Sequence, residues 1–337
     1  MASRFVLYQN SIKKFVSTQQ ILTNHKYKKT LFDTINSHKY IIPISLLTIM
    51  NCQLKKNKMQ SIYSYDMALG FELIVLLMEY SEHIKKINTN PLFESISNEY
   101  LFIPILLSNI NQLFCQNAKL LPQTNTSDEN INISENIIYC SEKINTEIVN
   151  IISYIDHTRI NEHDIPNDWK LIKKTDLTNF NFRNSSCLKK LYTFKKIPKD
   201  VLISYYINTY CKLCSMSLTV GWLLGCSRLD MVDNLDRLGY HFGLLLKLSN
   251  DFVNLEKDIL LTGENQCTYN YVINYGLQES FELFDECKKN FYKGVMTLDI
   301  ATATIKEIIT SIDNSVMNVI EQSSPDIKQS ISSSHSR

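Results

Sequence analysis

Residues 244–259, LLLKLSNDFVNLEKDI, carry a polar side chain at every fourth position: Asn250, Asn254 and Asp258. Residues four apart lie on the same face of a helix, so a helix over this segment places the three side chains in a row. Amide and carboxylate oxygens are the ligands that Mg²⁺ takes from proteins. The spacing therefore indicates a metal site or the remains of one, and Asp251, beside the first position, is a fourth candidate ligand.

A second polar group ends the apolar pattern ELIVLLM of residues 72–78, where EYSEHIKK follows. Glu82 is suited to Mg²⁺, whereas His83 is a poor ligand for this hard cation and Lys86 carries a positive charge. We therefore treat Glu82 as the one candidate metal ligand of this group. A partly exposed polar helix end explains the same residues equally well.

Three lysines in these apolar and helical segments are candidates for binding an anion. They are Lys39 in SHKYIIP, Lys212 in YCKLCSMSLTVGWLLG, and Lys247 in the segment described first. A lysine offers a single mobile positive charge and lacks the bidentate geometry of arginine. A solvated lysine at a helix start accounts for Lys39 as well, and a lysine that extends to the surface accounts for Lys212.

The elements that position these residues are predicted to be helices. Apolar residues recur with helical spacing, no alternating strand pattern is present, and only 8 Gly and 7 Pro occur in 337 residues. The basic stretch 170–196 has no clean period and is predicted to be a long loop. The predicted helices span residues 65–86, 101–121, 136–155, 199–226, 228–258, 279–292 and 301–321.

Composition excludes several classes of protein. The net charge of +1 produces no strong positive field that would attract nucleic acid. The longest apolar runs are too short to cross a bilayer. Nine scattered cysteines in mostly apolar surroundings are typical of reduced core residues. The pair Cys211 and Cys214 has no second pair at zinc-binding spacing, so a structural zinc site is not expected.

The N-terminus differs from the rest of the chain. Residues 1–32 contain six basic residues and no acid before Asp33, a composition typical of a mitochondrial transit peptide. We expect residues 1–30 to be a targeting segment or a basic extension, residues 31–322 a single all-helical domain, and residues 323–337 a disordered tail. The expected location is the mitochondrial matrix, with the cytoplasm as the alternative.

Five segments occur in an order that resembles the trans-polyprenyl diphosphate synthases, over roughly residues 33–276. SHKYIIP resembles G-G-K-R-x-R-P, and residues 72–86 resemble E-L-I-H-x-x-x-L-x-H-D-D-x-x-D, with E-L-I intact. IPILLSNINQLFCQNAKLL resembles the helix A-I-L-x-G-D-x-L-L, and Lys212 matches the lysine of a K-T-G helix. HFGLLLKLSNDFVN resembles G-x-x-F-Q-x-x-D-D-x-x-D, where Asp251 is the one aspartate that remains.

The resemblance implies an all-α fold of the isoprenoid-synthase type, a bundle of roughly ten or more helices around a central cavity. Active members hold Mg²⁺ between two facing aspartate-rich motifs and bind the diphosphate of an allylic substrate there. Lys39, Lys212 and Lys247 would be the diphosphate-binding residues in this chain. Glu82, Asn250, Asp251, Asn254 and Asp258 would be the remains of the metal sites.

The departures from these motifs resemble subunit 2 of decaprenyl and solanesyl diphosphate synthases, which is non-catalytic. The resemblance implies a chain that needs no cofactor by itself and pairs with a catalytic subunit in a heterodimer or heterotetramer, where Mg²⁺ is held mainly by the partner. That complex condenses isopentenyl diphosphate with an allylic diphosphate to make the ubiquinone side chain. Each unmatched charge near a diphosphate costs roughly 1 to 4 kcal/mol, so the isolated chain is expected to be nearly inactive.

Three alternatives remain at this point. The chain could be an independent Mg²⁺-dependent prenyltransferase. It could also be a class I terpene cyclase, because N-D-x-x-S/T-x-x-x-E places its metal ligands where Asn250, Asn254 and Asp258 stand. A prenyl-lipid-binding protein that needs no metal is the third alternative, since an apolar cavity can hold a prenyl chain alone.

Overall fold

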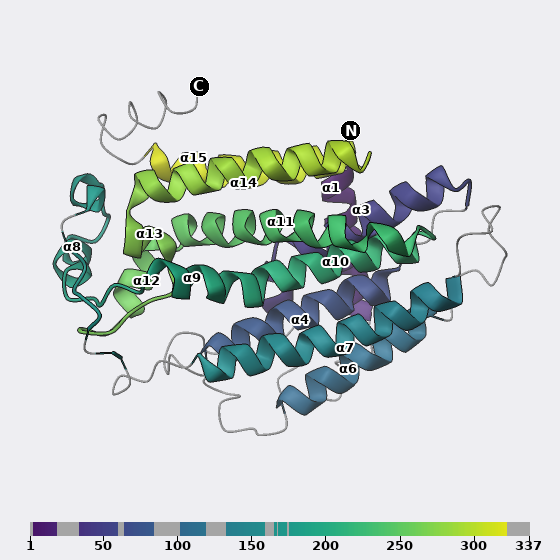
Figure 1. Ribbon diagram of the computed structural model, residues 1–337, viewed down its shortest axis with the longest axis horizontal. Coiled ribbons are helices and arrows are strands. Elements are labelled where there is room, and N and C mark those ends of the chain that lie inside the picture. The colour runs from purple at the N-terminus through teal and green to yellow at the C-terminus, as the bar shows by residue number, and fades with distance from the viewer. Residues whose placement is uncertain are drawn as a thin grey trace.

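The computed structural model describes residues 3–18, 34–59, 64–83, 102–118, 133–158, 165–166, 168–173 and 175–321; the side chains of residues 80–83, 102–106 and 117–118 lie outside this description. Long helices run side by side through most of the molecule (Figure 1). The helices are α1 (Arg4–Thr18), α3 (Ile41–Lys56), α4 (Tyr65–His83), α6 (Phe102–Ala118), α7 (Ile133–His157), η1 (Asp176–Asn179), α8 (Ser186–Leu191), α9 (Lys199–Tyr206), η2 (Ile207–Cys211), α10 (Lys212–Leu224), η3 (Leu229–Met231), α11 (Val232–Val253), α12 (Leu255–Leu261), α13 (Tyr271–Tyr275), α14 (Leu277–Thr297) and α15 (Ala303–Ile320).

The predicted all-α fold is confirmed. Within the described ranges the only β pairing is an isolated antiparallel bridge between Leu171 and Lys195. No helix in the described part of the chain is both long and apolar enough to span a membrane. All nine cysteines are free, and burial raises the pKa of several of their thiols, as in the Cys140 thiol at about 12.

Helix α10 lies at the centre of the bundle, where it packs against α3, α7 and α11 (Figure 1). Every residue of α10 from Leu213 to Leu224 is buried. Two glycines of α11 permit its close approach: a Cβ added at Gly239 would stand 2.3 Å from Cα of Ser215, and one at Gly243 would stand 2.4 Å from Cα of Cys211. Gly239 and Gly243 therefore allow α11 to pack closely on α10, at Ser215, and on the π-helical turn before it, at Cys211.

The predicted helix 199–226 is continuous but not uniform. Its middle, Ile207–Cys211, is a π-helical turn between α9 and α10. Such turns are rare insertions in α-helices and occur frequently at functional sites. Tyr210 lies within this turn and lines the pocket described below, and Tyr206, which precedes the turn, is buried and donates to Asp251.

The predicted helix 228–258 is wrong in one respect. Helix α11 ends at Val253 and α12 begins at Leu255, because Asn254 between them has φ −94° and ψ 10°. The backbone hydrogen bonds from Asn254 N to Asn250 O, at 2.9 Å, and from Asp258 N to Asn254 O, at 2.8 Å, remain. The polar row therefore crosses a helix interruption rather than one regular helix.

Helix α1 lies within the segment expected to be a targeting sequence or an extension. It packs against α3, α4 and α15, and its Ile12 and Val16 side chains are fully buried. The backbone nitrogen of Phe5 donates to Glu307 Oε2 at 3.2 Å. These contacts make α1 part of the folded bundle in this structure.

Candidate functional site

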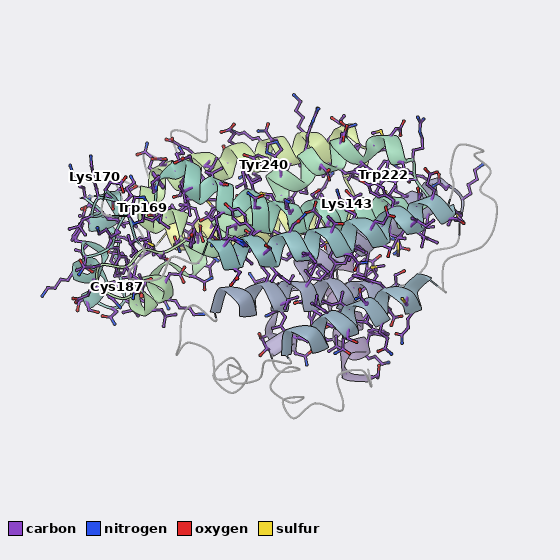
Figure 2. All side chains as sticks on the ribbon, turned by 60° about the horizontal axis from the view of Figure 1, so that its bottom comes forward. Lys143, Trp169, Lys170, Cys187, Trp222 and Tyr240 are labelled. Atoms are coloured by element: carbon purple, nitrogen blue, oxygen red, sulfur yellow. The ribbon has the colours of Figure 1, made fainter. Side chains whose placement is uncertain are left out.

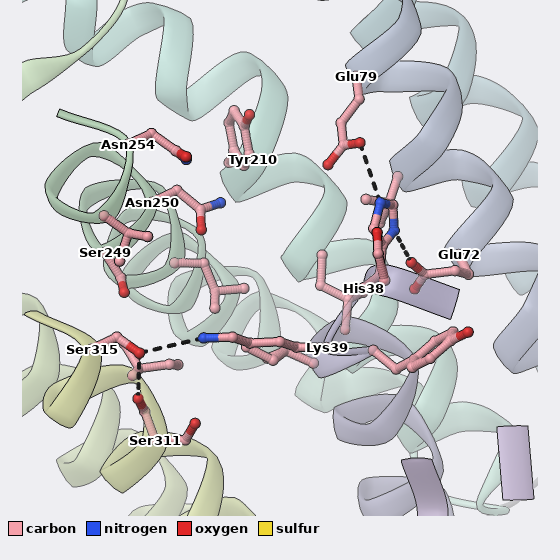
Figure 3. Close-up of a pocket in the computed structure, with 18 of the residues that line it drawn as sticks. His38, Lys39, Glu72, Glu79, Tyr210, Ser249, Asn250, Asn254, Ser311 and Ser315 are labelled. Atoms are coloured by element: carbon pink, nitrogen blue, oxygen red, sulfur yellow. Dashed lines mark hydrogen bonds and ion pairs between the residues drawn. The ribbon is translucent and has the colours of Figure 1, made fainter. Parts of the chain in front are cut away.

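A pocket of about 400 Å³ opens between the start of α3, the middle of α4, the end of α11 and α15 (Figure 3). One part of its wall is apolar, from Val75, Met78, Leu246, Val253 and Ile312. Tyr40, Ile41 and Ile42 line the pocket at the start of α3, and its polar wall comes from Ser37, His38, Lys39, Glu72, Glu79, Tyr210, Ser249, Asn250, Asn254, Ser311 and Ser315. Mixed walls of this kind, at a volume of roughly 300–1,000 Å³, are typical of small-molecule sites.

The carboxylates of α4 at this pocket are paired with a histidine (Figure 3). Nδ1 of His38 is hydrogen-bonded to Glu72, whose side chain is 2% exposed, and its Nε2 stands 3.5 Å from Glu79 Oε2. Burial alone would lower the pKa of His38, but the hydrogen bond and charge of Glu72, with the charge of Glu79, raise it to about 9. His38 is therefore an imidazolium at neutral pH and compensates charge on α4.

Lys39 faces the pocket from the opposite direction. Its side chain is exposed, and its Nζ donates to Ser315 Oγ on α15 at 3.4 Å. Tyr40, the next residue, adopts a left-handed backbone conformation with φ 56° and begins α3. This conformation is uncommon for a bulky residue, and it turns the chain sharply between the pocket residues His38 and Lys39 and the first turn of the helix. Lys39 is thus the predicted diphosphate ligand that does line the pocket.

The predicted metal row is divided between two environments. Asn250 and Asn254 line the pocket, whereas Asp258 lies beyond the helix interruption. Asp258 Oδ2 accepts a hydrogen bond from Asn270 Nδ2 at 2.8 Å. The terpene-cyclase pattern needs all three residues at one metal, so this arrangement disfavours that alternative.

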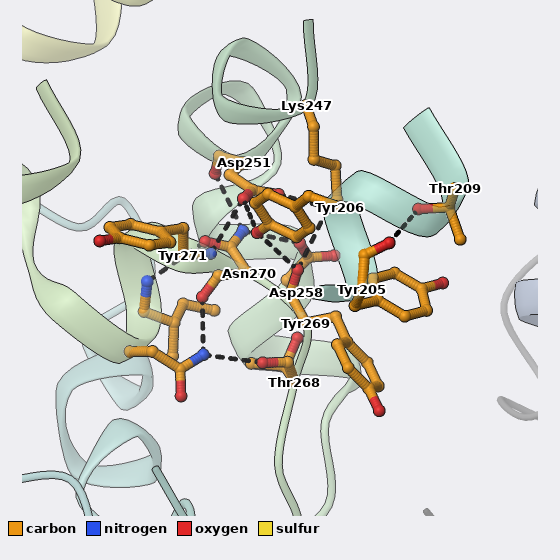
Figure 4. Close-up of polar contacts among 12 residues, drawn as sticks. Tyr205, Tyr206, Thr209, Lys247, Asp251, Asp258, Thr268, Tyr269, Asn270 and Tyr271 are labelled. Atoms are coloured by element: carbon orange, nitrogen blue, oxygen red, sulfur yellow. Dashed lines mark hydrogen bonds and ion pairs between the residues drawn. The ribbon is translucent and has the colours of Figure 1, made fainter. Parts of the chain in front are cut away.

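Asp251 and Lys247 form the centre of a buried polar network below the pocket (Figure 4). Lys247 Nζ donates to Asp251 Oδ1 at 2.5 Å, and Asp251 Oδ2 accepts from the Tyr206 hydroxyl and from Tyr271 N. The Lys247 ammonium also lies 5.1 Å from the centre of the Tyr206 ring. Burial raises the pKa of Asp251, and the charge of Lys247 and these hydrogen bonds lower it. The net result is a pKa of about 6.

Asp251 therefore does not present its carboxylate to the pocket. Its side chain is 1% exposed, and both of its oxygens accept hydrogen bonds from protein donors. The Lys247 ammonium, one turn away on the same helix, occupies the position beside the carboxylate where a bound metal ion would stand. Lys247 itself is also occupied by this contact, so the structure places both residues in a packing role.

Of the two remaining predicted positions, Lys212 lies outside this pocket lining. Lys212 on α10 stands with its Nζ 3.2 Å from Glu147 Oε2 on α7, and both side chains are partly exposed. Its partner is thus a carboxylate of a neighbouring helix. Glu82 lies in the last turn of α4, and its side chain is outside the residues that the structure describes.

The described residues do not fit a magnesium cluster. No group of three or more His, Cys, Asp or Glu side chains among them is arranged to hold a metal ion. On α11 the pocket-facing groups are the neutral amides of Asn250 and Asn254, and on α4 the described carboxylates already contact His38. Mg²⁺ prefers carboxylate and water oxygens in octahedral geometry, which these groups do not supply.

The motif comparison missed His38, Glu79 and Tyr210 as pocket residues. A signal existed for His38, because an acid in the middle of an apolar helix, as Glu72 is, needs a partner when buried. That partner lies in the segment SHKYIIP, which is separated from α4 by the whole of α3. The sequence therefore did not show that the two would meet. Tyr210 reaches the pocket from the π-helical turn, which regular helical spacing does not predict.

No family model and no curated protein matches the sequence. Comparison of structures finds a geranyltransferase from Helicobacter pylori with a TM-score of 0.60 and 15% identity, covering 94% of this chain and 99% of that one. The same enzyme complexed with magnesium and isoprenyl diphosphate gives 0.54 and 16%, covering 94% and 99%. A geranyltransferase from Legionella pneumophila gives 0.56 and 11%, covering 93% and 99%. The chain therefore has the fold of these geranyltransferases, the isoprenoid-synthase bundle that the sequence predicts.

Proposed function

We propose that the chain is a non-catalytic subunit of a heteromeric trans-polyprenyl diphosphate synthase. The observation that carries this proposal is the state of Asp251, the one aspartate left in its motif, which is buried and paired with Lys247. A residue in this state holds the bundle together and leaves no carboxylate on the pocket-facing end of α11 for a metal–diphosphate complex. The same fold in magnesium-dependent chemistry appears in the geranyltransferase structure with magnesium and isoprenyl diphosphate.

The charge of the pocket supports the same proposal. Its described ionisable groups are His38, Lys39, Glu72 and Glu79, two cations and two anions, so Lys39 is the single cation that no carboxylate in this set neutralises. A diphosphate without metal carries several negative charges, and one lysine compensates a small part of them. In the proposed complex Mg²⁺ and the allylic diphosphate are therefore held mainly by the catalytic partner. The complex condenses isopentenyl diphosphate onto that allylic primer to build the ubiquinone side chain, in the mitochondrial matrix.

The test is an assay of condensation by three purified samples: this chain, a catalytic polyprenyl diphosphate synthase from the same source, and the two co-expressed. We expect no product from this chain alone. Co-expression is expected to yield a complex, a heterodimer or heterotetramer, whose product yield or chain length differs from that of the catalytic subunit alone. Condensation by the purified chain in the presence of Mg²⁺ would contradict the proposal and support an independent prenyltransferase.

A second candidate function is favoured by the apolar wall of the pocket. The side chains of Val75, Met78, Leu246, Val253 and Ile312 offer a surface for a hydrocarbon chain, and this contact needs no metal. A prenyl-lipid-binding protein would bind a prenyl alcohol and a prenyl diphosphate with similar affinity, with or without Mg²⁺. Calorimetric titration with farnesol and farnesyl diphosphate separates this function from the first, since it requires no partner chain.

A further inference from the structure

The stretch 168–199 concentrates positive charge at one end of the molecule. It contains nine Lys and Arg and two Asp, a net charge of +7, in a chain whose total is +1. The rest of the chain is therefore net negative. Figure 2 labels Trp169 and Lys170 together at this end, with Cys187 of α8 nearby, and in Figure 1 the small helix α8 stands at the same end beside α12.

The fold of this stretch brings its two ends together. Ile172 N donates to Phe194 O and Lys196 N donates to Lys170 O, both at 2.8 Å, around the bridge between Leu171 and Lys195. Ile172 and Phe194 point into the core. Side chains alternate along an extended strand, so Leu171, whose side chain is 48% exposed, points the other way, toward solvent.

Five cations of this stretch have no carboxylate partner among the described residues, and four of the five are exposed. Asp176 accepts from Leu277 N and Gln278 N, and Glu256 of α12 accepts from Arg183 N, so neither carboxylate forms an ion pair with these five side chains. We call these five residues the basic end: Lys170, Lys173, Arg183, Lys189 and Lys195.

Exposed apolar side chains lie among these cations. Leu171 is 48% exposed, and Leu260 of α12 is 40% exposed next to α8, where Lys190 Nζ donates to its carbonyl oxygen at 2.5 Å. Trp169, beside Lys170, is partly exposed. Lys and Arg around Leu and Trp are the composition of surfaces that attract anionic headgroups and insert apolar side chains at the headgroup level.

We propose that the basic end docks the protein onto an anionic lipid membrane. The cations contact phosphate and carboxylate headgroups, while the exposed Leu171 enters the interface between headgroups and acyl chains. A nucleic acid would use the cations alone, and the exposed leucine would contribute nothing specific to it. This inference goes beyond the proposed function and stands independently of it.

The test is co-sedimentation of the full chain with vesicles of phosphatidylcholine containing about 30 mol% phosphatidylserine, against phosphatidylcholine alone. We expect binding to the anionic vesicles only, weakened when salt rises from about 50 mM to about 500 mM. The triple variant Lys170→Glu, Lys173→Glu, Lys189→Glu should lose affinity on the order of a hundredfold, since each cation near the surface contributes about fivefold. Circular dichroism checks that each variant is folded.

Two further variants make the result specific. The control triple variant carries Lys55→Glu, Lys293→Glu and Lys306→Glu, at exposed positions on α3, α14 and α15. It changes the net charge by the same amount and should still bind anionic vesicles. Leu171→Ser leaves every charge in place and should weaken vesicle binding severalfold, but not binding to heparin. The proposal is overturned by no binding to anionic vesicles, by equal losses in the two triple variants, or by an unaltered vesicle affinity of Leu171→Ser.

Discussion

Lys247 and Asp251 form an ion pair one helical turn apart, with 2.5 Å between Nζ and Oδ1 and with side chains only 11% and 1% exposed. Removing one partner of such a pair leaves a buried charge alone, which costs about 3–5 kcal/mol. Lys247→Met keeps the length and apolar stem of the side chain. We expect it to lower the free energy of unfolding by about 3 kcal/mol, because the Tyr206 hydroxyl and Tyr271 N still stabilise the carboxylate.

Chemical denaturation measures this difference, and Lys212→Met is the matched control. The Lys212 pair with Glu147 is partly exposed, so its loss is expected to cost less than about 1 kcal/mol. Adding Asp251→Asn to Lys247→Met should recover part of the loss, since no buried charge then remains. Equal costs for the two lysine variants would show that Lys247 does not compensate a buried charge.

A second prediction concerns the pH dependence of stability that comes from His38. The pKa of His38 is about 9 in the fold, against the ordinary histidine value of 6.5 in the unfolded chain. The folded state therefore binds the proton more tightly, and the stabilisation is complete below pH 6.5 and is lost as the pH rises through 9. A pKa difference of this size corresponds to about 3 kcal/mol. The stability difference between the native chain and His38→Gln should shrink accordingly between pH 7 and 10.

Titration of the His38 imidazole by NMR provides a direct measurement. Glu79→Gln removes the negative charge near Nε2, leaves Glu72 at Nδ1, and should move the midpoint to lower pH without exposing Glu72. A midpoint at or below 6.5 in the native chain would contradict the charged pair of His38 and Glu72.

The sequence could predict the bundle, because long apolar patterns at helical spacing identify each buried helix without knowledge of its neighbours. It could not predict the direction of Asp251. Helical spacing placed this residue next to Asn250 at the metal row, but its burial is decided by Tyr206 and by Tyr271, which come from other elements. The interruption at Asn254 is likewise a backbone event that regular spacing does not contain.

The role of Lys247 illustrates the same limit. As a sequence position it matches the glutamine of an active motif and carries the right charge for a diphosphate. Its 9% exposure and its contacts with Asp251 and with Tyr269 O, at 3.2 Å, come from tertiary packing. A lysine one turn before an aspartate on a buried helix face is, in retrospect, a signal for an internal ion pair.

The packing of α11 on the π-helical turn η2 gives a third prediction. At Gly243 a Cβ would stand 2.4 Å from Cα of Cys211, which is backbone and has no freedom to move aside. Gly243→Ala should therefore destabilise the fold by about 2–3 kcal/mol, against the gain of roughly 1 kcal/mol that alanine normally brings to a helix. Thermal unfolding measures the change. Gly263→Ala is the control, because its new Cβ meets the flexible side chain of Gln266 and should cost far less stability. Similar losses at both glycines would show that the contact between Gly243 and Cys211 is not the cause.

The fourth prediction restores carboxylates to the pocket. Asn250→Asp with Asn254→Asp puts two negative charges on the end of α11 that already faces the pocket, opposite Glu79 on α4. Carboxylates are the ligands that Mg²⁺ and Mn²⁺ prefer, so calorimetry should detect Mn²⁺ binding in this variant and none in the native chain. The control variant carries Asn145→Asp and Asn150→Asp at exposed positions of α7. It adds the same charge outside the pocket and should bind no metal. Mn²⁺ binding of equal strength in the native chain would show that its amides already hold a metal, and the assignment of Asp251 and Lys247 to packing would no longer explain the inactive site.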